Sequence, residues 1–433
     1  MRHDSRPSVV SAPDPTDAEL HGTWGLPGTS QRLRGRLVAS EGRQRLQLEG
    51  LLQLEGLLPV SSSERHITIQ GGLLDGRAVS LLDCDLAARR VGRPDMYMDE
   101  WHVGRSLLGL LVADAQERVF AGVRLELHGL AEAVGLSGLS VTSSDLTSPQ
   151  NKRVAVEWEE PAPIAATFGS GTLTLRCHSR FEAMSDFEFG LTNRAVAQLT
   201  ADAPISLDDV DRFADDLLSL VALATEASGG VTKLTLQPTG RDLDIVVSTT
   251  GRPWYGPNPA AQEPRLTLAQ LGSEAQGVIE AFQRFRREQP EAAELLFEYQ
   301  VFAAVMTPPD RFLYLARFLE AYHRRDAGIA SKVDFVDRVT ALLKGSGKAA
   351  NRAFGAPARQ LAETIRDTRN YYVHYDPKRR AKARHGVPLD DLADRAWCAV
   401  RSVLLSDLGL PDPTIENILE TDWRFQRASE APL

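Results

Sequence analysis

The sequence is poor in cysteine and has no long apolar run. Its 433 residues include three cysteines, Cys84, Cys177 and Cys398, which stand far apart with no CxxC pair and no histidine at metal-ligand spacing. This pattern argues against a zinc site or a disulfide framework and favours a reducing compartment. No apolar run is long enough to cross a membrane, and the first twenty residues lack the apolar core of a secretory signal. We therefore expect a cytoplasmic protein with no membrane partner and a disordered tail over residues 1–20.

An excess of positive charge is also missing. The 49 Lys and Arg residues against 58 Asp and Glu residues give a net charge of −9, which is the wrong sign for a protein that coats nucleic acid. Any contact with nucleic acid must therefore be local. The hydrophobic share of 43% and the charged share of 25% are typical of a soluble globular protein. The length of 433 residues predicts two or three domains.

The common signatures of metal, cofactor and nucleophile chemistry are absent too. There is no HExxH motif, no dinucleotide fingerprint and no Ser-His-Asp order. The segment Gly345-Ser-Gly-Lys348 resembles the end of a phosphate-binding P-loop, but no glycine stands at the required earlier position and Ala349 replaces the metal-binding Ser or Thr. We interpret this segment as a flexible basic loop, and we expect neither a metal nor a cofactor.

Between about residues 22 and 190 the dominant hydrophobic period is two, with glycine-rich breaks and without long helical crossovers. This spacing favours an antiparallel sandwich or an open barrel. Ser206 begins a helix, with Asp209 at the capping-box position, and two further strands follow it. The predicted strands are 33–38, 66–70, 78–82, 119–127, 153–158, 171–177, 187–191, 231–236 and 243–247.

A segment rich in proline and glycine, residues 251–264, breaks all regular structure, and the pattern after it is helical. The fold class is therefore α+β, with an antiparallel β-rich domain followed by an all-α bundle. We place the domain boundaries at residues 1–20 for the tail, 21–250 for the β-rich domain, 251–272 for a linker and 273–433 for the bundle. The predicted helices are 274–288, 291–306, 310–325, 332–344, 357–374 and 389–405.

The helix predicted from Pro357 carries the residues that point most clearly to chemistry. Leu361, Ile365, Thr368 and Tyr372 form a core-facing stripe, while Glu363, Asp367, Asn370 and His374 lie on the opposite face and Arg369 lies at its flank. Histidine can move protons near neutral pH, and arginine can stabilise the charge that develops on a phosphate. Alternatively, Arg369 pairs with Asp367 or Glu363, and His374 only caps the helix C-terminus.

Two further groups could support such a site. Five basic residues follow His374 closely, and they could contact RNA phosphates or form an ordinary solvated loop. Glu320 and His323 lie one turn apart on the helix predicted over 310–325, so they could support the site or form an exposed pair. The basic residues are Lys378, Arg379, Arg380, Lys382 and Arg384.

Arg369, Asn370 and His374 resemble the signature motif of the HEPN superfamily, whose catalytic members are metal-independent ribonucleases. The opening Gly22-Thr-Trp-Gly-Leu-Pro-Gly28, with Gly35 and with Asp75 to Leu81, resembles the N-terminal domain of ApeA-type anti-phage defence proteins, in which it precedes a HEPN domain. The segment Phe312 to His323 is similar to the early helix of ApeA-type HEPN domains.

The resemblance implies an anti-phage defence protein that acts by abortive infection. It implies that the HEPN domain cleaves RNA without metal, through the RNA's own 2′-hydroxyl, with Arg369, Asn370 and His374 as catalytic residues. It also implies a homodimer or larger even assembly, RNA as substrate with tRNA as one candidate, and a β-rich domain that senses a phage-derived trigger and regulates the nuclease. The alternative is a non-catalytic HEPN module that binds a nucleotide or a partner.

Overall fold

The computed structural model describes residues 19–430 except 41–42, 54–65, 92–96, 137–138, 144–153, 186–187, 227–228, 242, 250–265, 304, 324–332, 346, 355 and 376. The described residues divide into two compact units. The first lies within Met1–Ala121, Pro204–Asp209 and Lys233–Pro253, and the second within Gly122–Ala203, Val210–Thr232 and Trp254–Leu433. The predicted tail and linker fall largely outside the described residues, so the domain boundaries stay a prediction.

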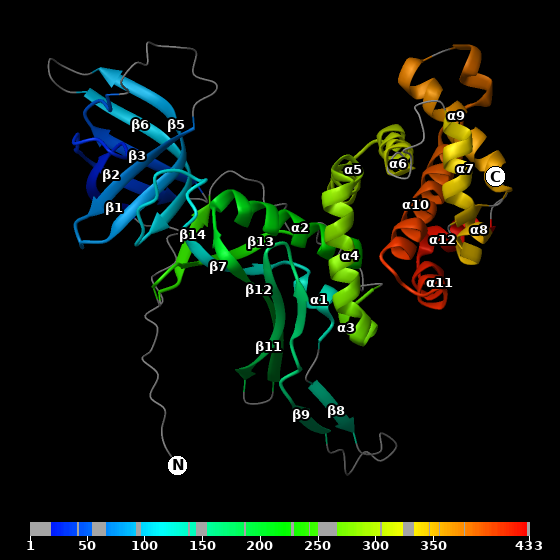
Figure 1. Cartoon of the computed structure of the whole chain (residues 1–433), viewed down its shortest axis with the longest axis horizontal. Helices are drawn as coiled ribbons and strands as arrows, with labels where there is room; N and C mark the ends of the chain where they lie inside the picture. Colours follow the sequence, from blue (N-terminus) through cyan, green and yellow to red (C-terminus); the bar gives the residue numbers. More distant parts are fainter. Residues whose placement is uncertain are drawn as a thin grey trace. The chain divides into compact units, whose positions relative to one another are not determined.

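The first unit is built on six antiparallel strands in the order β6-β3-β2-β1-β4-β5, and β5 also pairs with β6. Each strand thus has two neighbours in the ring, and the sheet closes into a barrel (Figure 1). The sequence predicted a sandwich or an open barrel; the pairing of β5 with β6 closes it. The strands are β1 (Glu19–Gly25), β2 (Leu33–Ser40), β3 (Arg43–Glu49), β4 (Ile67–Leu73), β5 (Ala78–Val91) and β6 (Tyr97–Leu108).

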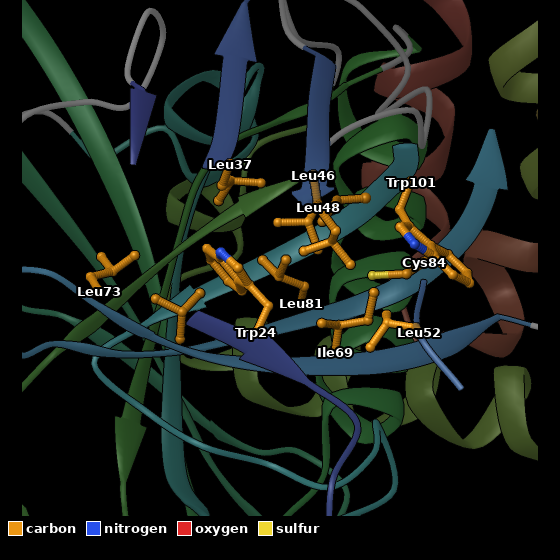
Figure 2. Packing of buried hydrophobic residues seen from close by; sticks show 12 residues of the cluster. Trp24, Leu37, Leu46, Leu48, Leu52, Ile69, Leu73, Leu81, Cys84 and Trp101 are labelled. Carbon is orange, nitrogen blue, oxygen red and sulfur yellow. The ribbon is translucent and has the colours of Figure 1, made fainter. Parts of the chain in front are cut away.

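Two tryptophans lie in the core of this barrel. Trp24 and Trp101 are 0% and 2% exposed and pack among leucines from neighbouring strands, as Figure 2 shows. Gly71 pairs with Trp24 across β4 and β1, and a Cβ atom at Gly71 would come within 2.3 Å of the Trp24 ring. Any other residue at 71 would therefore displace the tryptophan. Trp24 belongs to β1, and a turn at Pro27 and Gly28 follows that strand.

Two further strands, β13 (Val231–Pro238) and β14 (Ile245–Thr249), pair antiparallel in the first unit, and β14 continues onto β6. The second unit has a sheet in the order β10-β11-β12-β7, in which β11 is antiparallel to both β10 and β12, and a separate hairpin of β8 and β9. Its strands are β7 (Phe120–Leu127), β8 (Leu139–Ser143), β9 (Val154–Trp158), β10 (Ile164–Thr167), β11 (Gly171–Ser185) and β12 (Glu188–Ile205), and a short helix, α1 (Leu130–Val134), follows β7.

Helix α2 (Leu207–Thr225) begins as the sequence predicts. The Ser206 hydroxyl accepts a hydrogen bond from the Asp209 N–H at 3.2 Å, and the Asp209 carboxylate accepts one from the Ser206 N–H at 3.0 Å. These two bonds form a capping box, which satisfies backbone donors that the helix start leaves without partners.

The remainder of the second unit is helical (Figure 1). The six predicted helices are present, whereas α3, α8, α11 and α12 were not predicted from the sequence. The prediction of a flexible loop at residues 345–348 is wrong, because Gly347 and Lys348 are the first two residues of α8. The helices are α3 (Leu268–Leu271), α4 (Ala275–Glu288), α5 (Pro290–Phe302), α6 (Pro308–His323), α7 (Phe335–Gly345), α8 (Gly347–Phe354), α9 (Ala358–His374), α10 (Val387–Asp407), α11 (Asp412–Glu420) and α12 (Trp423–Glu430).

Helix α10 lies at the centre of this region and packs against α6, α7, α8, α11 and α12. Its residues from Leu392 to Leu405 are buried, as expected of a helix with neighbours on every side. Among the described residues, none of the helices is long and apolar enough to span a membrane.

A buried group of charges lies at the C-terminal part of α10. Arg401 is 1% exposed and pairs with Glu226, which follows α2, and with Asp422 at 3.5 Å. Arg424 pairs with both of these carboxylates and rests over the Trp397 ring at 5.2 Å. Burial lowers the pKa of Arg401 to about 10, so the guanidinium is still charged at neutral pH. Its charge is therefore balanced by carboxylates from two distant parts of the chain.

Candidate active site

Helix α9 forms because its apolar residues recur at helical spacing. Leu361, Ile365 and Thr368 of the predicted stripe are buried, and Tyr372 is half-buried. Pro357 takes the N-cap position, so the helix begins at Ala358 and not at the proline. The buried face packs against α6 and α7, and the helix ends at His374. This packing fixes the direction in which the polar residues of α9 project.

Arg369 is held by residues from two neighbouring helices. Its Nη2 atom lies 2.7 Å from Oε2 of Glu320 on α6, and its guanidinium carbon lies 5.3 Å from the centre of the Phe335 ring at the start of α7. The two charged side chains are only 26% and 21% exposed. An ion pair and a cation–π contact thus fix a cation at a partly exposed place.

The alternative pairing of Arg369 with its neighbours on α9 is not what the structure shows. Glu363 pairs with Arg359 at 3.4 Å, and Asp367 pairs with Arg366 at 2.8 Å. Glu320 is therefore not a member of an exposed pair, because it binds Arg369 directly. His323 is the last residue of α6, and its side chain lies outside what the structure describes.

Asn370 and His374 lie one helical turn apart near the end of α9. Asn370 is half-buried and His374 is exposed. Within the part of the chain that the structure describes, neither side chain has a hydrogen-bond partner. Since His374 occupies the last turn, its protonated form would interact favourably with the carbonyl end of the helix. Both side chains are placed where an added molecule could reach them.

The basic residues after His374 are more ordered than a solvated loop. Residues Pro377–Lys382 form a short 3₁₀ helix, η4, which packs against α9. Arg379 lies 3.5 Å from Asp367, and the N–H of Arg384 donates to the Thr368 hydroxyl at 3.2 Å. Lys378, Arg380 and Lys382 are exposed. Two of the five basic residues thus hold the segment on α9, and three present their side chains to solvent.

Three tyrosines and a histidine adjoin this segment, and we refer to them as the tyrosine cluster: Tyr371, Tyr372, Tyr375 and His385. The ring of Tyr371 contacts those of Tyr372, Tyr375 and His385 in edge-to-face geometry, with centroids 5.0, 6.0 and 4.9 Å apart. Nδ1 of His385 lies 3.0 Å from the Tyr372 hydroxyl, and its Nε2 lies 3.1 Å from the Arg380 carbonyl. Because a carbonyl can only accept, Nε2 carries a proton.

Phe335 and His385 were not among the residues predicted from the sequence. Phe335 lies 34 positions before Arg369, and no local pattern connects the two. His385 directly follows the basic residues, so its position was the one available signal. Among the described residues, no group of three or more His, Cys, Asp or Glu side chains could hold a metal ion.

All three cysteines are buried free thiols. Burial raises the pKa of the Cys84 and Cys398 thiols, which keeps both in the unreactive protonated form at neutral pH. Neither of these two thiols is therefore poised as a nucleophile at neutral pH.

Comparison with known families gives two matches. Residues 19–246 match ApeA N-terminal domain 1, which covers more than half of the 433 residues, and residues 313–414 match Apea-like HEPN. The second match includes most of α6 and the whole of α7, α9 and α10, and so all the residues of the site described above. No curated protein and no solved structure matches the chain. The chain therefore belongs to the ApeA-type family of anti-phage defence proteins, in which an ApeA N-terminal domain 1 precedes an Apea-like HEPN domain.

Proposed function

We propose that the helical region cuts RNA without a metal ion, as the effector of an abortive anti-phage response. HEPN domains are usually related to ribonucleases, and they generally act on RNA and dimerise. The observation that carries the proposal is the placement of Arg369: a cation fixed by Glu320 and Phe335, on the helix that ends in an exposed histidine. A phosphate needs such a cation when charge develops on it, and a hydroxyl nucleophile needs a proton acceptor.

In the proposed reaction the 2′-oxygen of one nucleotide attacks its own 3′-phosphorus, and the bond to the 5′-oxygen of the next nucleotide breaks. The 2′-hydroxyl proton passes to a base, and an acid returns a proton to the departing 5′-oxygen, so the products are a cyclic phosphate and a 5′-hydroxyl. His374 is the candidate for these proton transfers, Arg369 stabilises the phosphate charge, and Asn370 orients the phosphate or His374.

The directions of the two side chains support action by a homodimer. Arg369 and His374 are five residues apart, which corresponds to about 140° around an α-helix. Arg369 accordingly projects toward α6, whereas His374 is exposed to solvent. Two copies related by a two-fold axis could bring His374 of one copy to Arg369 of the other, so that a dimer would contain two such sites.

The nucleophile can be tested with modified RNA. An RNA that carries a single deoxy or 2′-methoxy sugar just 5′ to a cut should resist at that position, and unmodified RNA should yield a cyclic phosphate end. Single-stranded DNA should be inert. Efficient cleavage at the blocked position would exclude the mechanism.

Mixing two inactive variants tests the shared site. If each site uses His374 of one copy and Arg369 of the other, then a heterodimer of His374→Ala with Arg369→Ala contains one intact site and one doubly substituted site. Random mixing should then restore about one quarter of the wild-type activity. Should each site use both residues of one copy, the mixture would stay inactive.

A non-catalytic HEPN module that binds a nucleotide or a partner is the other candidate. The exposed basic residues of η4 suit this function equally well. Cleavage products that appear with the wild type and not with His374→Ala would decide against it.

A further inference from the structure

Tyr375, the residue directly after His374, has an unusual backbone conformation. Its φ angle is +48°, in the left-handed region, where it ends α9. A side chain with a Cβ atom is sterically disfavoured there, and helices commonly use glycine or asparagine at this position. The need to end the helix therefore does not explain why a tyrosine occupies this position. Such outliers cluster at functional sites, so the residue calls for another explanation.

The Tyr375 ring is also unusually exposed. Tyr375 as a whole is 69% accessible to solvent, although the edge-to-face contact with Tyr371 orients its ring. Tyr371 is itself braced by His385, and the two hydrogen bonds of His385 hold that ring in place. The Tyr375 ring is thus exposed to solvent and held in position by Tyr371 and His385.

The surroundings of the ring are basic. Lys378, Arg380 and Lys382 are exposed on η4, and the Arg380 carbonyl bonds His385, so the basic turn and the tyrosine cluster are joined. Proteins that bind single-stranded nucleic acid combine aromatic rings, on which bases stack, with cations that contact the backbone. In double-stranded RNA the bases are already stacked on one another, so a free base requires a single strand.

We propose that Tyr375 stacks against a nucleobase of single-stranded RNA and thereby positions the strand beside His374. This inference rests on the proposed function in one respect, namely that RNA is the ligand. It adds that the substrate is unpaired at the site, and that base contact at Tyr375 contributes to affinity independently of the base's identity, because every base has a stacking face.

Binding of a labelled single-stranded RNA 12-mer to the full-length chain tests the proposal. Every variant carries His374→Ala, so that the RNA stays intact. Tyr375→Ala should weaken binding on the order of tenfold, while Tyr375→Trp should bind about as well as the parent. Tyr97→Ala is the matched control, because Tyr97 is a 43% exposed tyrosine on β6.

A series of 12-mers with one abasic residue at successive positions sharpens the test. At the position whose base stacks on Tyr375, an abasic residue should weaken binding to the parent by a similar factor. The same abasic residue should cause no further loss in Tyr375→Ala, because that variant already lacks the ring on which the base would stack. Equal binding by Tyr375→Ala and its parent would overturn the proposal. It would also be overturned if every abasic residue weakened binding by the same factor in Tyr375→Ala as in the parent. A change of oligomeric state on light scattering would also overturn it, by assigning the ring to a contact between copies.

The proposal and the proposed function fail in different ways. If base stacking is found and the wild type leaves RNA uncut, the nuclease proposal fails while the stacking site stands. If RNA is cut and Tyr375→Ala binds like its parent, the stacking site fails alone. The absence of any RNA binding would overturn the stacking site directly.

Discussion

Replacement of Arg369 by alanine should damage local stability as well as any catalysis. From its position on the helix, the sequence predicts only a small folding defect. The structure shows instead that the side chain is 26% exposed and contacts both Glu320 and Phe335. Loss of the cation–π contact costs about 1 kcal/mol. Loss of the ion pair with Glu320 should cost about 1 kcal/mol more, between the small value of an exposed pair and the large value of a fully buried one.

The sum of about 2 kcal/mol can be measured by hydrogen exchange of peptides from α6 and α9, because exchange through local opening follows the free energy of opening. Exchange should become about 30-fold faster in Arg369→Ala, at 1.4 kcal/mol for each factor of ten. His374→Ala should change it by less than about 0.5 kcal/mol, since His374 is exposed.

A second substitution separates stability from catalysis. Glu320→Gln in the Arg369→Ala background removes the negative charge that has lost its arginine and should recover about 1 kcal/mol, or roughly a fivefold slowing of exchange. Cleavage should not return, because the cation is still missing. Unchanged exchange in Arg369→Ala would refute the reasoning about the ion pair, and full cleavage by that variant would remove Arg369 from the proposed mechanism.

Three further predictions concern the basic segment, metal ions and pH. Arg380→Gln combined with Lys382→Gln should weaken RNA binding and reduce the slope of log affinity against log salt by up to about 1.4, without changing the cyclic phosphate end; an unchanged slope would place the RNA elsewhere. Cleavage should survive EDTA, and loss of cleavage that magnesium or manganese restores would contradict the proposed proton transfers. Burial raises the pKa of Asp394 from 3.8 to about 6, so the folded state holds that proton more tightly than the unfolded state, and stability should fall as pH rises from about 4 to 6. Asp394→Asn should flatten the melting temperature across this range, and an unaltered profile would count against Asp394 as the source.

The sequence predicted several local features of the fold, because these depend on neighbouring residues, although strands β1, β3, β6, β8 and β10 were not predicted. The period of α9 identified Leu361, Ile365 and Thr368 as buried, and the Ser206–Asp209 capping box was recognised from spacing alone. The helices that were missed are short, such as α8 and α11, and a short segment gives few repeats of any period.

Features that depend on distant residues could not be predicted in this way. The closure of the barrel requires β5 to pair with β6, and the alternation within each strand does not say which strands will be neighbours. Likewise, Arg369 meets Glu320 from 49 residues away, so the local sequence offered only Asp367 and Glu363 as partners. The candidate site was thus located from sequence, while the contacts that fix its arginine came from the structure.

The pairing of Arg401 with Glu226 has a consequence for dividing the chain into parts. Glu226 falls within the match to the N-terminal domain, and Arg401 within the match to the HEPN domain. A fragment cut at the proline-rich segment would contain the arginine without this carboxylate, and a buried charge that loses a partner costs several kcal/mol. The N-terminal segment therefore cannot be exchanged without regard to this contact. A HEPN segment joined to a different N-terminal domain would need an aspartate or glutamate in the place of Glu226.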